Sequence, residues 1–160
     1  MSPPRYLLDT ALCLHVVRER PAWLLRRAEH VRAGDAALSV LTWGALQHAA
    51  SRGPRRLAAL PLLEELAGLL PILPLPPDAG IAYREVHAAL ATRRRMAVRH
   101  RDAAALPDHD AWLLAHARAA RLALITHAGR RLPPVPGVRI VCWESREAPA
   151  RLAQPRYLRP

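Results

Sequence analysis

Short apolar runs alternate along this sequence with longer segments of helical spacing, and this alternation constrains the fold more than any other feature. The runs predicted as strands are residues 6–8, 37–41, 71–75, 122–126 and 138–143. The segments predicted as helices are residues 11–18, 21–32, 55–70, 78–95 and 108–121, together with the segment between Thr42 and Ser51. Strands that alternate with helices form βαβ units, in which helices cover both faces of a parallel sheet. We therefore expect an α/β fold, a three-layer α/β/α sandwich with a mainly parallel central sheet.

Local signals refine the ends of these elements. Thr42 and Asp108 precede apolar helical segments and are predicted to cap them with side-chain oxygens. Pro71 and Pro74 lie within the third predicted strand, which favours an edge strand or a strand with ragged ends because proline cannot donate to a ladder. The 160 residues are enough for one domain with a proper core. We expect that domain at residues 1–143, followed by an irregular, Arg- and Pro-rich tail at residues 144–160.

No membrane or secretion signal is evident in the sequence. No stretch reaches the roughly 20 apolar residues that a membrane-spanning helix needs, and the first residues lack a signal-peptide pattern. Cys13 and Cys142 both lie in apolar segments without the spacing of metal ligands. We therefore expect two buried thiols in a soluble, cytoplasmic protein without a membrane partner.

The charge of the chain is strongly positive. Its 24 basic residues are all Arg and stand against 13 acidic residues, which gives a formal net charge of +11. Such a field attracts RNA or an acidic protein, and Arg can grip a phosphate with two hydrogen bonds. The densest basic segment contains Arg93, Arg94, Arg95, Arg99 and Arg101. An ordinary solvated basic surface is the alternative interpretation.

Carboxylates are expected at one edge of the predicted sheet. Asp9 ends the first strand, while Asp108 and Asp110 open a late helix. Functional groups gather at the carboxyl ends of parallel strands, and two or more converging carboxylates suit Mg²⁺. A bound divalent ion of this kind can activate water against a phosphodiester. Taken alone, the same residues are better explained as a turn residue and as helix-start charges.

Six ordered segments resemble PIN-domain ribonucleases of the VapC toxin type. They are YLLDTALCL at residues 6–14, LSVLTWGAL at 38–46, LPL at 73–75, LPDHDAWLLAHA at 106–117, LITHA at 124–128 and VPGVRI at 135–140, followed by Trp143. No single segment is specific, whereas their order and spacing are. The resemblance implies a PIN fold in which acidic residues bind Mg²⁺ or Mn²⁺ for RNA cleavage.

Carried over by position, the resemblance assigns the site residues. Asp9 and Asp110 stand at the catalytic and metal-binding acids, with Asp108 as a further metal candidate. The basic segment from Arg93 to Arg101 would hold the RNA backbone. The family Glu falls on Ala45, the Asn after Asp-Thr falls on Ala11, and the last acidic or amide position falls on His127 or Ala128. The site is therefore predicted to be eroded, with weakened metal binding. His116 matches a family His and is predicted to be structural.

Three functions remain open from the sequence. The first is a metal-dependent endoribonuclease, the toxin of a toxin–antitoxin pair, with RNA and an antitoxin protein as partners and a homodimeric state. The second is a catalytically inactive PIN-like domain that binds RNA or an antitoxin. The third is a basic α/β binding module unrelated to PIN domains. Ala45 favours the second over the first, and the ordered segments disfavour the third. No zinc-ligand spacing, Gly-rich phosphate loop or Gly-x-Ser-x-Gly elbow is present.

Overall fold

The computed structural model describes residues 3–19, 22–23, 26, 30–32, 34–52, 56–96, 106–127 and 132–143. Its elements are β1 (Tyr6–Leu8), α1 (Thr10–Glu19), β2 (Ala36–Ser39), α3 (Val40–Ser51), α4 (Arg56–Leu69), β3 (Ile72–Leu73), α5 (Ala79–Met96), α6 (Asp108–Ala119), β4 (Ala123–His127) and β5 (Arg139–Trp143). Of the helix predicted over 21–32, positions 22, 23 and 26 are helical and most of the rest lies outside the described residues. The predicted tail, residues 144–160, also lies outside them.

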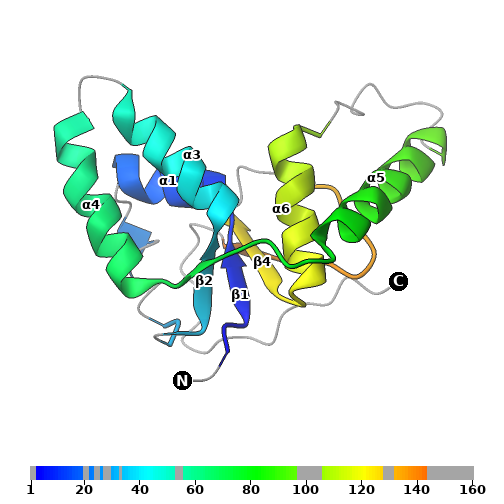
Figure 1. Cartoon of the computed structure of the whole chain (residues 1–160), viewed down its shortest axis with the longest axis horizontal. Coiled ribbons are helices and arrows are strands. Elements are labelled where there is room, and N and C mark those ends of the chain that lie inside the picture. The colour runs from blue at the N-terminus through cyan, green and yellow to red at the C-terminus, as the bar shows by residue number, and fades with distance from the viewer. Residues whose placement is uncertain are drawn as a thin grey trace.

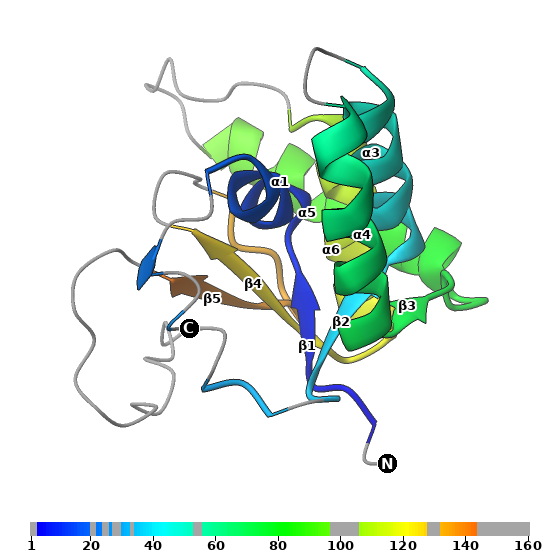
Figure 2. The same ribbon diagram turned by 90° about the vertical axis from the view of Figure 1, so that its left-hand side faces the viewer.

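The five strands form one sheet in the order β3-β2-β1-β4-β5. All four strand pairs are parallel, with Leu7 of β1 between Ala37 of β2 and Leu124 of β4. The predicted α/β fold with a parallel sheet is thus confirmed (Figure 1). β3 lies at the sheet edge, as its flanking prolines predicted (Figure 2). Because all strands run the same way, their carboxyl ends meet at one edge of the sheet.

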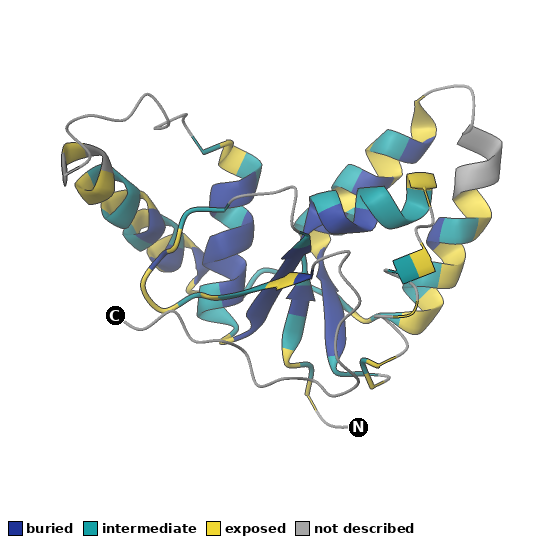
Figure 3. Ribbon diagram, turned by 180° about the vertical axis from the view of Figure 1, so that it is seen from behind, coloured by how far each residue is buried: buried dark blue, intermediate teal, exposed yellow. Residues whose placement is uncertain are grey.

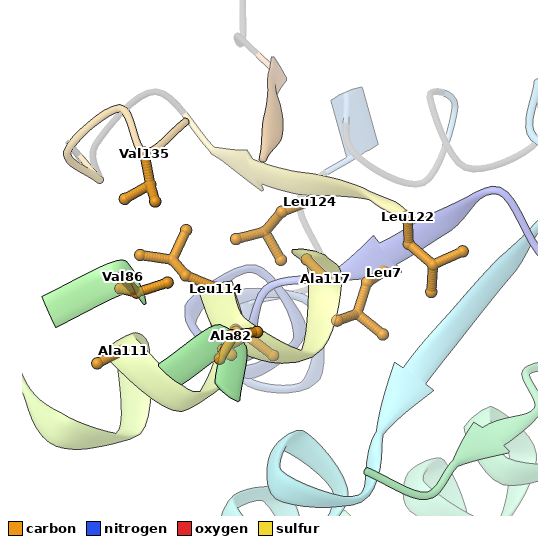
Figure 4. Packing of buried hydrophobic residues seen from close by; sticks show 11 residues of the cluster. Leu7, Ala82, Val86, Ala111, Leu114, Ala117, Leu122, Leu124 and Val135 are labelled. Carbon is orange, nitrogen blue, oxygen red and sulfur yellow. The ribbon is translucent and has the colours of Figure 1, made fainter. Parts of the chain in front are cut away.

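Helices cover the two faces of the sheet. On one face, Leu7 and Leu124 pack with residues of α5 and α6, including Val86 and Leu114 (Figure 4). On the other face, α1, α3 and α4 pack over β2 and β4 in two further clusters, whose buried residues are Cys13, Leu38, Leu46, Ala50 and Leu63, and Leu12, Ile125 and Trp143. The period of two along each strand divides neighbouring residues between these faces. β4 and α6 are mostly buried (Figure 3), so α6 has a fixed position against the sheet.

Two predicted caps and one predicted burial are wrong. α3 begins at Val40, and Ser39 caps it by accepting a 3.1 Å hydrogen bond from the backbone N–H of Leu41. Thr42 is therefore inside the helix. Asp108 is the first residue of α6 and makes no cap hydrogen bond. Cys142 is exposed on β5, whereas Cys13 is buried as predicted.

Within the ranges that the structure describes, no helix combines the length and the apolar character needed to cross a membrane.

Candidate functional site

Backbone hydrogen bonds fix Asp9 at the carboxyl end of β1. Its N–H donates to the carbonyl of Ile125 on β4 at 2.8 Å, which extends the β1–β4 ladder by one residue. Its carbonyl accepts from the N–H of Cys13 at 3.0 Å, which closes the first turn of α1. Asp9 is therefore both the end of a strand and the start of a helix. Its side chain leaves the sheet at the edge where functional groups of α/β folds gather.

The Asp9 carboxylate is fully buried and hydrogen-bonded. Its Oδ2 accepts a 2.7 Å bond from the hydroxyl of Thr126 on β4, and its Oδ1 accepts a longer one, 3.4 Å, from the N–H of Ala11. Buried carboxylates need such donors because leaving water is costly. Burial first, and the charge of Asp9 second, raise the pKa of the Cys13 thiol. Cys13 is thus a protonated core residue rather than a nucleophile.

Thr10 connects three helices at this edge. Its Oγ1 lies 2.8 Å from Thr42 Oγ1 on α3 and 2.8 Å from His109 Nε2 on α6. His109 precedes Asp110, which is buried in the first turn of α6 and donates its N–H to the carbonyl of Pro107 at 2.9 Å. These contacts bring the starts of α1 and α6 together although Thr10 and His109 are 99 positions apart. The two predicted acids therefore sit on adjoining helix starts.

Ala45 lies one turn beyond Thr42 on α3 and is half-buried. Residues three apart share a helix face, so Ala45 is on the face that bonds to Thr10. Among the described residues, no group of three or more His, Cys, Asp or Glu side chains is arranged to hold a metal ion. One surviving acid, Asp9, already accepts two hydrogen bonds. The described side chains therefore supply at most two carboxylates to a metal ion, which would need water or substrate oxygens to complete its coordination.

His116 and His127 make different kinds of contact. His116 is fully buried, its Nδ1 lies 2.9 Å from Ser39 Oγ, and its Nε2 has no hydrogen-bond partner within the described structure. This bond joins α6 to the end of β2, in keeping with the structural role predicted for His116. His127, at the end of β4, stacks on His15 with ring centroids 5.4 Å apart.

Burial of His116 predicts a dependence of stability on pH. Burial lowers the pKa of His116 below its usual 6.5 in the folded chain. Above about pH 6.5 both states are neutral, and below it only the unfolded chain takes up the proton, so stability falls as pH falls. Urea unfolding at pH 7.5 and 5.5 should show wild type losing about 1 kcal/mol more than His116→Gln, within the limit of about 1.4 kcal/mol per pH unit. Equal losses in the two proteins would contradict this assignment.

Sequence reasoning missed the residues that support the acids. Thr126 and the Thr10–Thr42–His109 contacts were not predicted, although threonines at strand ends and helix starts are a recognisable signal. Asp108, predicted as a further metal candidate, accepts a hydrogen bond from the Tyr83 hydroxyl on α5. Arg93 and Arg95 are exposed on α5, as RNA binding requires. The side chain of Arg94, and all of Arg99 and Arg101, lie outside the described structure.

Known proteins resemble this chain in sequence and in fold. The sequence model of the PIN domain matches residues 6–138. Ribonuclease VapC2 of Haemophilus influenzae is 24% identical over 139 residues, which span 87% of this chain and 98% of that protein. DNA-bound VapBC from Salmonella typhimurium shares the fold with a TM-score of 0.73 and 22% identity, over 88% of this chain and 98% of that one. VapBC2 from Rickettsia felis, bound to a DNA fragment from its promoter, has a TM-score of 0.73 and 18% identity, over 86% of this chain and 98% of that one.

Proposed function

This chain belongs to the PIN-domain family, and from that premise we propose that it is a VapC-type endoribonuclease toxin whose cleavage is strongly weakened. The observation that carries the proposal is the 2.8 Å contact between Thr10 and His109, the residues next to Asp9 and Asp110, together with the bond from Thr126 to Asp9. Two carboxylates persist where the family resemblance places its acids. The matching curated relatives are named ribonucleases.

The weakening follows from Ala45. Its methyl group replaces the carboxylate that the resemblance places on this face of α3, and no third acidic ligand compensates among the described residues. We propose that Mg²⁺ or Mn²⁺ binds weakly, since two protein carboxylates leave the remaining positions to water and substrate phosphate. A catalytically inactive domain that binds RNA or an antitoxin is the second candidate, favoured by the same missing acid.

A cleavage assay distinguishes the two candidates. Wild type should cut single-stranded RNA slowly in millimolar Mn²⁺, and Asp9→Asn should abolish the cutting because it removes one of the two remaining charges. The readout is product formation over time on a gel. Thr92→Ala, on the exposed part of α5, serves as the matched control. Undetectable wild-type cleavage at every Mn²⁺ concentration would select the inactive binding domain, whereas cleavage that survives in Asp9→Asn would refute the site.

Electrostatic RNA binding gives an independent prediction. Arg93 and Arg95 are exposed on α5, and each phosphate contact displaces counterions and steepens the salt dependence by about 0.7 log units per log unit of salt. Fluorescence anisotropy with a labelled oligonucleotide should therefore give a shallower slope for Arg93→Gln/Arg95→Gln. The control, Arg139→Gln, changes an exposed Arg at the amino end of β5 and should leave the slope unchanged. If the RNA affinity of wild type does not change with salt concentration, the electrostatic interpretation is wrong.

An antitoxin protein is the proposed macromolecular partner. Its support is that structural neighbours of this fold are VapBC complexes and other toxin–antitoxin complexes. A net charge of +11 favours an acidic partner segment. We also propose that the chain forms a homodimer, which analytical ultracentrifugation would test.

A further inference from the structure

An aromatic cluster joins α5 to α6 outside the acidic site. Tyr83 of α5 and Trp112 of α6 are stacked, with centroids 4.1 Å apart and planes inclined by 22°. His87, one turn after Tyr83, lies 4.5 Å from its ring. The Tyr83 hydroxyl donates to Asp108, which shares a helix face with Trp112. We define these three rings, Tyr83, His87 and Trp112, as the aromatic shelf.

The shelf lies at the protein surface rather than in the core. Among the described residues, Tyr83 is partly buried and packs against the apolar core between α5, α6 and the sheet, whereas Trp112 is not part of that core. Trp112 is half-buried and His87 is exposed, whereas the neighbouring Ala111 and Leu113 are buried. A large planar ring therefore borders solvent at a place where packing of α6 is already provided by aliphatic residues.

Charge around the shelf favours an anionic ligand. Arg84, Arg93 and Arg95 are exposed on the same helix as Tyr83 and His87. Two nearby carboxylates already have partners, since Asp108 accepts the Tyr83 hydroxyl and Glu85 of α5 is paired with Arg118 at 2.7 Å. A ligand that suits this surface offers a flat neutral ring and a flexible phosphate backbone. Unpaired nucleotides have both, and base–aromatic stacking works with every base because each has a π-face.

Resting on the proposed function, we propose that the aromatic shelf stacks an unpaired base of single-stranded RNA through Trp112, while Arg84, which follows Tyr83 on α5 and is exposed, holds an adjacent phosphate. The shelf adjoins Asp108 and thus the start of α6, which also carries Asp110. Paired bases are inaccessible to such a surface, so the shelf selects unpaired segments.

Removing the ring of Trp112 distinguishes base stacking from electrostatic attraction to the phosphates. Affinity is measured by fluorescence anisotropy in EDTA, so that divalent-ion-dependent cleavage is suppressed, with a labelled uridine oligonucleotide and an abasic oligonucleotide of the same length. Wild type should prefer the uridine form. Trp112→Leu should lose about tenfold in affinity for it, the scale of a single base–aromatic stack, and should bind both forms alike with an unchanged salt slope. Trp112→Phe retains a ring and should keep most of the preference.

The outcomes separate the shelf from the proposed function. If Trp112→Leu is folded by circular dichroism and keeps the wild-type preference, the shelf is wrong while salt-dependent RNA binding stands. If Trp112→Leu does not fold, Trp112→Phe and wild type still decide, because a wild type without preference for bases overturns the shelf. If wild type binds neither oligonucleotide, both proposals fail, and a protein partner becomes the remaining candidate to bind the shelf. Tyr83→Phe loses only the bond to Asp108 and should preserve the preference.

Discussion

Ala45→Glu should tighten Mn²⁺ binding by roughly 5- to 150-fold, equivalent to about 1–3 kcal/mol, the scale of charge-assisted contacts. Ala45 shares its helix face with Thr42, which bonds to Thr10 next to Asp9. A glutamate there adds a third carboxylate at this edge. The helix should tolerate it, because Glu and Ala have similar propensities. Ala45 is in the second turn of α3, so the helix dipole contributes little.

The sign of the stability change sharpens this test. Without a cation, the added charge should repel the two existing acids and lower the melting temperature in EDTA, and Mn²⁺ should reverse the loss. Calorimetric titration and thermal melts measure the two effects, and RNA cleavage should rise together with affinity. Ala45→Gln matches the size without the charge, and Gln47→Glu places the same charge at an exposed position of α3. If Ala45→Glu behaves like either control, position 45 does not face the acids.

Much of this fold is predictable because its signals are local. Residues 6–8 and 122–126 are short apolar runs, and nearly the same residues form β1 and β4. The periodic spacing over 55–70 and 78–95 corresponds closely to α4 and α5. Prolines beside residues 72 and 73 predicted the edge strand. In each case a property of a few adjacent residues decides the element, and no contact between distant segments is needed to see it.

The errors arise where tertiary contacts override local preference. Thr42 looks like a cap, yet its hydroxyl bonds to Thr10 across 32 positions, and Ser39 caps the helix instead. Asp108 looks like a cap, yet it makes no cap hydrogen bond and Tyr83 of another helix donates to it. Cys142 lies in an apolar run, but β5 is the outer strand of the sheet and leaves this residue exposed. Sequence patterns carry no direct record of such partners.

In the candidate site, too, local features can be predicted from the sequence whereas tertiary contacts cannot. Asp9 and Asp110 are identifiable from the sequence because one ends a strand and the other opens a helix. Their support is not identifiable, because Thr126 and His109 become neighbours of Asp9 and Thr10 only when β1, β4 and α6 assemble. A site of this kind depends on the positions of α3 and α6 as much as on its acids. Ser39 contacts both helices, because its hydroxyl caps α3 and lies 2.9 Å from Nδ1 of His116 on α6.

Ser39→Ala should destabilise the fold by about 2–4 kcal/mol. The hydroxyl of Ser39 caps α3 through Leu41 and meets His116 Nδ1 of α6 at 2.9 Å, in a fully buried setting. Losing a cap costs about 1 kcal/mol, and leaving a buried nitrogen without a partner costs about 1–3 kcal/mol more. Ser51→Ala also removes a serine bond, to the carbonyl of His48, but at an exposed site. It should stay within about 0.5 kcal/mol of wild type.

A double-mutant cycle separates the two roles of Ser39. His116→Leu removes the nitrogen that Ser39→Ala would leave unpaired, and replacing both partners of a buried hydrogen bond by apolar groups can be nearly neutral. Ser39→Ala/His116→Leu should therefore unfold at higher urea than the sum of the single losses implies, with a coupling of about 1–3 kcal/mol. The remaining deficit, about 1 kcal/mol, is the lost cap of α3. Strict additivity would mean that the Ser39–His116 bond contributes nothing, and that α3 and α6 are positioned by apolar packing alone.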